Sequence, residues 1–128
     1  TYSTFDISQA LPYDSQSFDV VYAHLSIHYF SDSVTRGIIK EVARVLKPRG
    51  KFYFRCKSIN SDEKNVSTQI ELGIFVSNDT GHIRHLFSLE YTADILRGRF
   101  TVHKLEETQE KYRKNVSIFV DCWAEKAI

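Results

Sequence analysis

The feature that most constrains this sequence is a strand–helix–strand pattern over residues 18–56. Residues 18–23 are a run of β-branched and aromatic side chains, which is typical of a buried strand. Apolar side chains then recur at helical spacing over residues 34–46, and residues 52–56 return to a strand pattern. Because a helix of this length allows a right-handed parallel crossover, the pattern predicts an α/β fold.

Both ends of the expected helix carry boundary signals. Asp32 or Ser33 is a suitable N-cap, because its short polar side chain can accept a hydrogen bond from a free backbone N–H. At the other end, the run Lys-Pro-Arg-Gly at residues 47–50 combines basic side chains, a proline and a glycine, a combination that ends helices.

The second half of the chain follows a polar stretch at residues 57–69, which divides one domain rather than two. Residues 69–76 are mixed in character and predict no definite element. Ser88 is expected to cap a short helix that ends near Gly98. Residues 100–112 and 115–126 read as two strands joined by a tight turn, which predicts an antiparallel hairpin.

Composition narrows the class of protein. The chain has 128 residues, 42% of them hydrophobic, and a net charge of +1. A protein that binds nucleic acid through its phosphates usually has a basic excess, so such binding is not expected. No apolar run is long enough to cross a membrane, and residues 1–6 do not resemble a secretory signal. Cys56 and Cys122 are too few for a disulfide scaffold, so a cytoplasmic location is expected. The sequence contains no methionine, which suggests that the chain is a fragment.

A set of short motifs follows in order along the first half of the chain. They are Asp6-Ile7, Leu11-Pro12-Tyr13, Ser17 to Ala23, Ile27 to Phe30, Asp32 and Ala43 to Gly50. Together they resemble the class I S-adenosylmethionine-dependent methyltransferases, whose pattern includes an acidic residue, an LP dipeptide, an SFDVV strand, a histidine, an aspartate and an RVLKPGG turn. The resemblance is strong over residues 6–56 and looser beyond, and the tellurite-resistance methyltransferases are one possible subfamily.

The resemblance implies a Rossmann-like sheet in the order 3-2-1-4-5-7-6, with strand 7 antiparallel. The chain would be a single partial domain over residues 1–128, starting at strand 3 in residues 2–7. Strands 1 and 2 and the glycine-rich cofactor loop would be absent, because none of the five glycines forms a GxGxG motif. We therefore expect a mostly parallel sheet that lacks its first two strands and ends in an antiparallel hairpin.

The resemblance also implies S-adenosylmethionine as cofactor, S-adenosylhomocysteine as product and a set of cofactor-binding residues. Asp6 would accept a hydrogen bond from the adenine amino group, while Ile7 would donate its backbone N–H to a ring nitrogen and pack on the ring. Ala23, His24 and Leu25 follow the fourth strand of the family fold, at the edge where open α/β sheets bind ligands.

The histidines allow several interpretations. His28 is a candidate general base near the methyl acceptor, although a merely hydrogen-bonded or exposed ring is an equally good interpretation. His82 and His85 fall in the segment that covers the acceptor pocket in the family. His24 and His28 are four residues apart and His82 and His85 three apart, but no third ligand accompanies either pair, so no metal site is predicted.

Two functions remain open at this stage. The first is methyl transfer to a small-molecule acceptor by a longer enzyme, of which this polypeptide alone would bind the cofactor poorly or not at all. The alternative is a non-catalytic, truncated methyltransferase-like domain that forms dimers or other interactions through the open edge of its sheet. A nucleotide-binding domain of another kind is disfavoured, because no phosphate loop is present.

Overall fold

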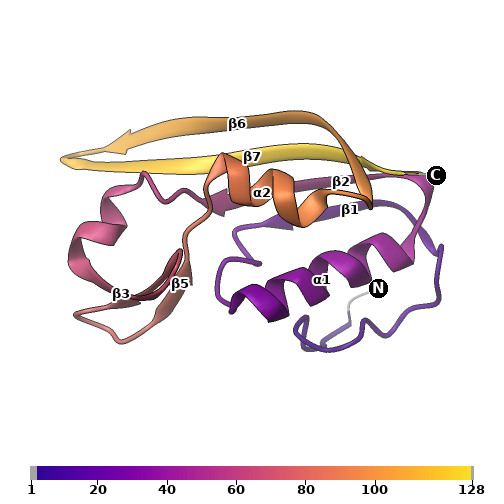
Figure 1. Ribbon diagram of the computed structural model, residues 1–128, viewed down its shortest axis with the longest axis horizontal. Helices are drawn as coiled ribbons and strands as arrows, with labels where there is room; N and C mark the ends of the chain where they lie inside the picture. The colour runs from indigo at the N-terminus through magenta and orange to yellow at the C-terminus, as the bar shows by residue number, and fades with distance from the viewer. Residues whose placement is uncertain (1–2, 128) are drawn as a thin grey trace.

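The computed structural model describes residues 3–127, apart from the side chains of residues 63, 112 and 115, and contains two sheets and two α-helices (Figure 1). The elements in chain order are β1 (Phe18–His24), α1 (Asp32–Val45), β2 (Leu46–Lys57), a short 3-10 helix (Asp62–Val66), β3 (Ser67–Glu71), β4 (Ile74–Ser77), β5 (Ile83–His85), α2 (Leu89–Leu96), β6 (Phe100–Tyr112) and β7 (Asn115–Lys126).

The larger sheet has the strand order β1-β2-β7-β6 (Figure 1). β1 and β2 are parallel, as the strand–helix–strand pattern predicts, and β6 and β7 form the expected antiparallel hairpin. β7 also lies antiparallel to β2. Of the three strand pairings in this sheet, one is parallel and two are antiparallel, so the expectation of a mostly parallel sheet is not confirmed. The two antiparallel pairings arise because a tight turn reverses the chain between β6 and β7, and β7 then lies beside β2.

The strand expected at residues 2–7 is not observed. Residue 2 lies outside the described residues, and residues 3–7 have no regular secondary structure. A strand is stabilised by pairing with a neighbour, and no described strand pairs with this segment.

The hydrophobic core lies between one face of the larger sheet and both α-helices. It combines the apolar stripe of α1 with alternate residues of β2 and β7 and with the end of α2; its fully buried members include Ile39, Phe52, Cys56, Val120 and Leu96. One face of the sheet is thereby covered. No helix among residues 3–127 is long and apolar enough to cross a membrane.

The start of α1 differs from the prediction by one residue. Ser31, rather than Asp32 or Ser33, is the N-cap, and its hydroxyl accepts a hydrogen bond from the Val34 N–H. The helix ends at Val45, one residue before the predicted helical spacing ends, and Leu46 and residues 47–50 belong to β2. Residues 47–50 then bulge from the parallel ladder, in which Phe18 pairs with Leu46 but Val20 with Lys51.

The small sheet, in the order β3-β4-β5, occupies the segment that the sequence left undefined. It ends next to α2, whose predicted N-cap is confirmed: the Ser88 hydroxyl accepts a hydrogen bond from the Tyr91 N–H at 3.0 Å. Ser58, directly after β2, forms a parallel bridge with Phe87. This bridge places the start of α2 at the end of β2.

Candidate functional site

The edge of the larger sheet where β1 and β2 end carries the candidate site. β1 ends at His24, and a loop leads from there to the first turn of α1. β2 ends at Lys57, and the bridge between Ser58 and Phe87 brings the first turn of α2 to the same place. Ligands of open α/β sheets bind at the carboxyl ends of the strands, often near helix N-termini.

Asp6 and Ile7 have groups that fit their expected roles toward an adenine ring. One carboxylate oxygen of Asp6 accepts hydrogen bonds from the Ser8 N–H at 2.9 Å and hydroxyl at 2.6 Å, and these bonds lower the pKa of Asp6. Within the described residues, the other oxygen and the Ile7 N–H have no partner. The Ile7 side chain packs against the core. A free acceptor, a free donor and an apolar surface therefore occur together.

Ala23, His24 and Leu25 lie at the end of β1. Ala23 pairs with Phe54 in the parallel ladder and packs against the core. His24 is exposed, and its ring stacks on Tyr22. Leu25 has a φ of 54°, and its N–H donates to the Arg55 carbonyl at 2.9 Å. Across the described residues, no hydrogen bond or ion pair joins these three to Asp6 or Ile7, so a shared cofactor site stays a prediction.

His28 is buried and links the loop after β1 to the end of β2. Its Nδ1 accepts a hydrogen bond from the Lys57 N–H at 3.1 Å, and its carbonyl accepts one from the His85 N–H. Burial, reinforced by the charges of Arg84 and Lys57, lowers the pKa of His28 to about 4. The ring is therefore neutral at pH 7 with its proton on Nε2, where it can donate a hydrogen bond. Its role as a general base remains a prediction.

His82 and His85 differ in their exposure to solvent. His82 is exposed, whereas His85 is 1% exposed and packs against Phe87 and Tyr91. His85 lines a cavity of about 450 Å³ between the first turns of α1 and α2 and the β3–β4 turn. Among residues 3–127, no group of three or more histidine, cysteine, aspartate or glutamate side chains is arranged to hold a metal ion.

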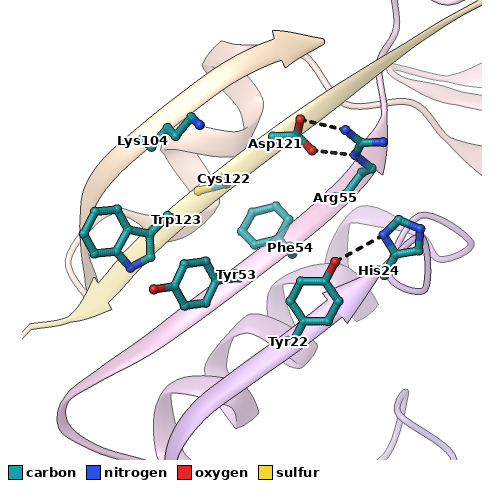
Figure 2. A pocket seen from close by; sticks show the side chains of 9 residues that line it. All are labelled: Tyr22, His24, Tyr53, Phe54, Arg55, Lys104, Asp121, Cys122 and Trp123. Atoms are coloured by element: carbon teal, nitrogen blue, oxygen red, sulfur yellow. Dashed lines mark hydrogen bonds and ion pairs between the residues drawn. The ribbon is translucent and has the colours of Figure 1, made fainter. Parts of the chain in front are cut away.

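A second hollow, of about 620 Å³, lies on the sheet face opposite the helices (Figure 2). Tyr22, Tyr53 and Trp123 are register neighbours on β1, β2 and β7, so their rings form a row across three strands. The rings of Tyr53 and Trp123 stack with 5.9 Å between their centroids. Beside this row, Arg55 and Asp121 form an ion pair through two hydrogen bonds, at 2.6 and 3.0 Å.

Sequence reasoning did not identify this aromatic row, although alternation in the strands contained the signal. Tyr22, Tyr53 and Trp123 occupy the positions that alternate with the core residues of their strands. Trp123 Nε1 is a fully buried donor without a partner in the described part of the chain. Cys56 and Cys122, in contrast, are free thiols buried in the core.

Comparison with known sequences supports the family resemblance. Residues 1–54 match the family described as "Methyltransferase domain". The chain is also 42% identical over 45 residues to the uncharacterized methyltransferase YcgJ of Bacillus subtilis. That match covers 35% of this chain and 17% of the relative.

Solved structures extend the likeness over nearly the whole chain. An S-adenosylmethionine-dependent methyltransferase of Methanosarcina mazei superposes with a TM-score of 0.79 and 24% identity, covering 97% of this chain and 66% of its own. One from Mesorhizobium loti superposes with a TM-score of 0.76 and 19% identity, covering 98% of this chain and 68% of its own. A third structure is the 1,6-didemethyltoxoflavin-N1-methyltransferase of Burkholderia thailandensis, solved with bound 1,6-didemethyltoxoflavin and S-adenosylhomocysteine. It superposes with a TM-score of 0.70 and 14% identity, covering 95% of this chain and 48% of its own. The chain therefore has a methyltransferase fold and spans just under two thirds of the M. mazei protein.

Proposed function

We propose that this chain, whose resemblance to the class I S-adenosylmethionine-dependent methyltransferases the comparisons confirm, is part of an enzyme that methylates a small molecule. The observation that carries the proposal is the agreement of sequence and topology. Residues 1–54 match the methyltransferase domain, and the order β1-β2-β7-β6 corresponds to strands 4-5-7-6 of the implied family sheet.

S-adenosylmethionine, when bound, supplies an electrophilic methyl group on a sulfonium. The residues that we propose for its adenosine end are Asp6 and Ile7, through the free carboxylate oxygen and the free N–H. Ala23, His24 and Leu25 are proposed to line the site at the end of β1. Positioning accounts for much of the catalysis of such a transfer, so few residues need to react. We also propose that the methyl acceptor is a small molecule and that the enzyme is located in the cytoplasm.

Calorimetric titration with S-adenosylhomocysteine tests the proposal. We expect weak or no binding by this chain and clear binding by a longer polypeptide that carries the glycine-rich loop. Asp6→Asn in the longer polypeptide should weaken binding about tenfold, because the amide puts an N–H donor where a free carboxylate oxygen faced the adenine amino group. The remaining amide oxygen can still accept the hydrogen bond from Ser8.

Asp14→Asn is the matched control, because Asp14 is an exposed aspartate in the neighbouring loop. The cofactor proposal fails if the longer polypeptide does not bind the ligand. The assignment of Asp6 fails separately if both variants bind as tightly as the unchanged protein.

A second candidate function is a dimerisation or interaction module. It is favoured by β1, which pairs only with β2 among the described strands and exposes 52% of Val20 and 69% of Tyr22. An unpaired edge with exposed apolar side chains tends to recruit another strand. Light scattering on the isolated chain tests this candidate: a dimer supports it and a monomer argues against it.

A further inference from the structure

The cavity between α1, α2 and the β3–β4 turn has a buried acceptor that the proposed methyl transfer does not use. His85 lies at the end of β5 and is 1% exposed. Its Nδ1 is 3.0 Å from the Phe30 carbonyl oxygen, and a carbonyl can only accept. Nδ1 must therefore carry the proton of the neutral ring, which leaves a lone pair on Nε2.

His85 lines the cavity, and its Nε2 lies on the edge of the ring next to Gly73. Nε2 has no hydrogen-bond partner within residues 3–127, yet it is not one of the fully buried unpaired atoms, so it keeps access to open space. Gly73 also lines the cavity, and a Cβ built on it would lie 3.6 Å from Nε2 and 3.2 Å from the Leu86 carbonyl oxygen. The glycine thus leaves room directly beside the free lone pair.

The charged groups around the cavity add more acceptors than donors. Three carboxylates and one guanidinium line it: Asp32, Glu71 and Asp94 against Arg36. Asp94 is already paired with Arg36 at 2.7 Å and with Arg97, outside the lining, at 2.9 Å.

Two of the carboxylates retain free oxygens. Asp32 uses one oxygen to accept from Tyr91 and Arg36, and its other oxygen has no partner among the described residues. Glu71 pairs with Ile74 in the β3–β4 ladder, but its side chain has no hydrogen-bond or ion-pair partner among the described residues. The hydrogen bond from the Tyr91 hydroxyl and the contact with Arg36 lower the pKa of Asp32, so it is ionised at pH 7.

Apart from Ser88, the remaining walls are largely apolar. Ile59, Leu86 and the ring of Tyr91 line the cavity, and Leu72 stands at its rim with 91% of its surface exposed. A volume of about 450 Å³ is within the usual range for a small-molecule site. Apolar walls with converging acceptors suit a ligand that has an apolar body and a donor-rich, positively charged end.

We propose that this cavity binds a small organic amine, whose ammonium group donates to His85 Nε2 and to the carboxylate of Asp32 while its apolar body lies against Leu72 and Tyr91. The site lies at the carboxyl ends of β1 and β2, where α/β sheets bind ligands. The proposal is independent of methyl transfer, because the amine is expected to bind without any cofactor.

The test is calorimetric or NMR titration of the full chain with phenethylamine, without cofactor, beside phenylacetate as an anion of the same size. We expect phenethylamine to bind and phenylacetate to bind at least about tenfold more weakly, because the acceptors would repel a carboxylate. Equal binding of the two probes, or no binding of phenethylamine, would overturn the proposal.

Two variants locate the binding. Gly73→Ala places a methyl group beside Nε2 and should weaken phenethylamine binding about tenfold. Gly81→Ala is its control, because Gly81 has a similar φ (73° against 78°) but nothing within 4 Å of an added Cβ. Equal losses in both glycine variants would refute the site.

His85→Asn is the alternative variant for the binding test if Gly73→Ala does not fold. The asparagine amide can keep the hydrogen bond to the Phe30 carbonyl but has no atom in the place of Nε2, so binding should fall about fivefold. Unchanged binding in a folded His85→Asn chain would also overturn the proposal. Titration of the longer polypeptide with S-adenosylhomocysteine reports on the proposed function separately.

Discussion

The burial of a neutral His28 should make the stability of this chain depend on pH. The side chain is 3% exposed, and its Nδ1 accepts a hydrogen bond from the Lys57 N–H, a bond that a protonated ring cannot accept. Burial and the nearby charges of Arg84 and Lys57 lower the pKa of His28 to about 4 in the folded chain. In the unfolded chain the pKa of the same group is about 6.5.

The sign of the effect follows from proton uptake. As the pH falls below about 6.5, the unfolded chain takes up a proton at His28 while the folded chain does not, so the free energy of unfolding decreases. The decrease continues until the pH reaches the folded pKa of about 4, below which both states are protonated. With these two pKa values, the loss at a pH of about 5 is about 2 kcal/mol relative to neutral pH.

Urea unfolding at pH values of about 5 and about 7.5 measures this loss. His28→Asn is the informative variant, because its amide oxygen can accept from the Lys57 N–H but does not titrate. The variant should lose about 2 kcal/mol less than the unchanged chain between the two pH values, whatever its stability at neutral pH. The pKa of the buried His85 is also lowered, and its contribution is present in both proteins.

His82→Asn is the control, because it makes the same substitution at a histidine whose side chain is exposed. The reasoning is refuted if His28→Asn and His82→Asn lose as much stability as the unchanged chain on acidification. That result would mean that the His28 ring is protonated as easily in the folded chain as in the unfolded chain.

Three further predictions concern the core and the open sheet face. Burial raises the pKa of the Cys56 thiol well above its usual value and that of Cys122 to about 12. A disulfide-exchange reagent should therefore label both thiols only after denaturant is added, and rapid labelling of the folded chain would contradict this prediction. Phe87→Ala should lower the free energy of unfolding by about 3–5 kcal/mol because the ring is fully buried, and a loss below about 1 kcal/mol in urea titration would place the ring outside the core. Asp121→Asn should lower the free energy of unfolding by about 1–3 kcal/mol, because it removes the charge opposite the half-buried Arg55. If urea unfolding at low salt shows a decrease near zero, solvent already screens the ion pair.

In the candidate site, local sequence patterns did not predict which side chains are buried or which distant residues are in contact. The sequence singled out His85 but could not separate it from His82, since both lie in a stretch without clear periodicity. Burial separates them, and it depends on Phe87 and Tyr91, which pack against the His85 ring. Asp32 was predicted as a helix cap and as part of the family motif, but not as part of this cavity. Its contact with Tyr91 joins residues 59 positions apart, which no local pattern contains.

The sequence by itself determined the local elements of this protein: the strand, helix and strand of residues 18–57, the cap of α2 at Ser88 and the β6–β7 hairpin. These depend on side-chain periodicity, capping groups and turns, which act over a few residues. The family resemblance also implied the place of β7 between β2 and β6. Only the tertiary structure decided that residues 3–7 form no strand and that His85 lines a cavity. Those outcomes depend on which distant segments pair and pack together, and the free energy of such contacts is not contained in any single segment.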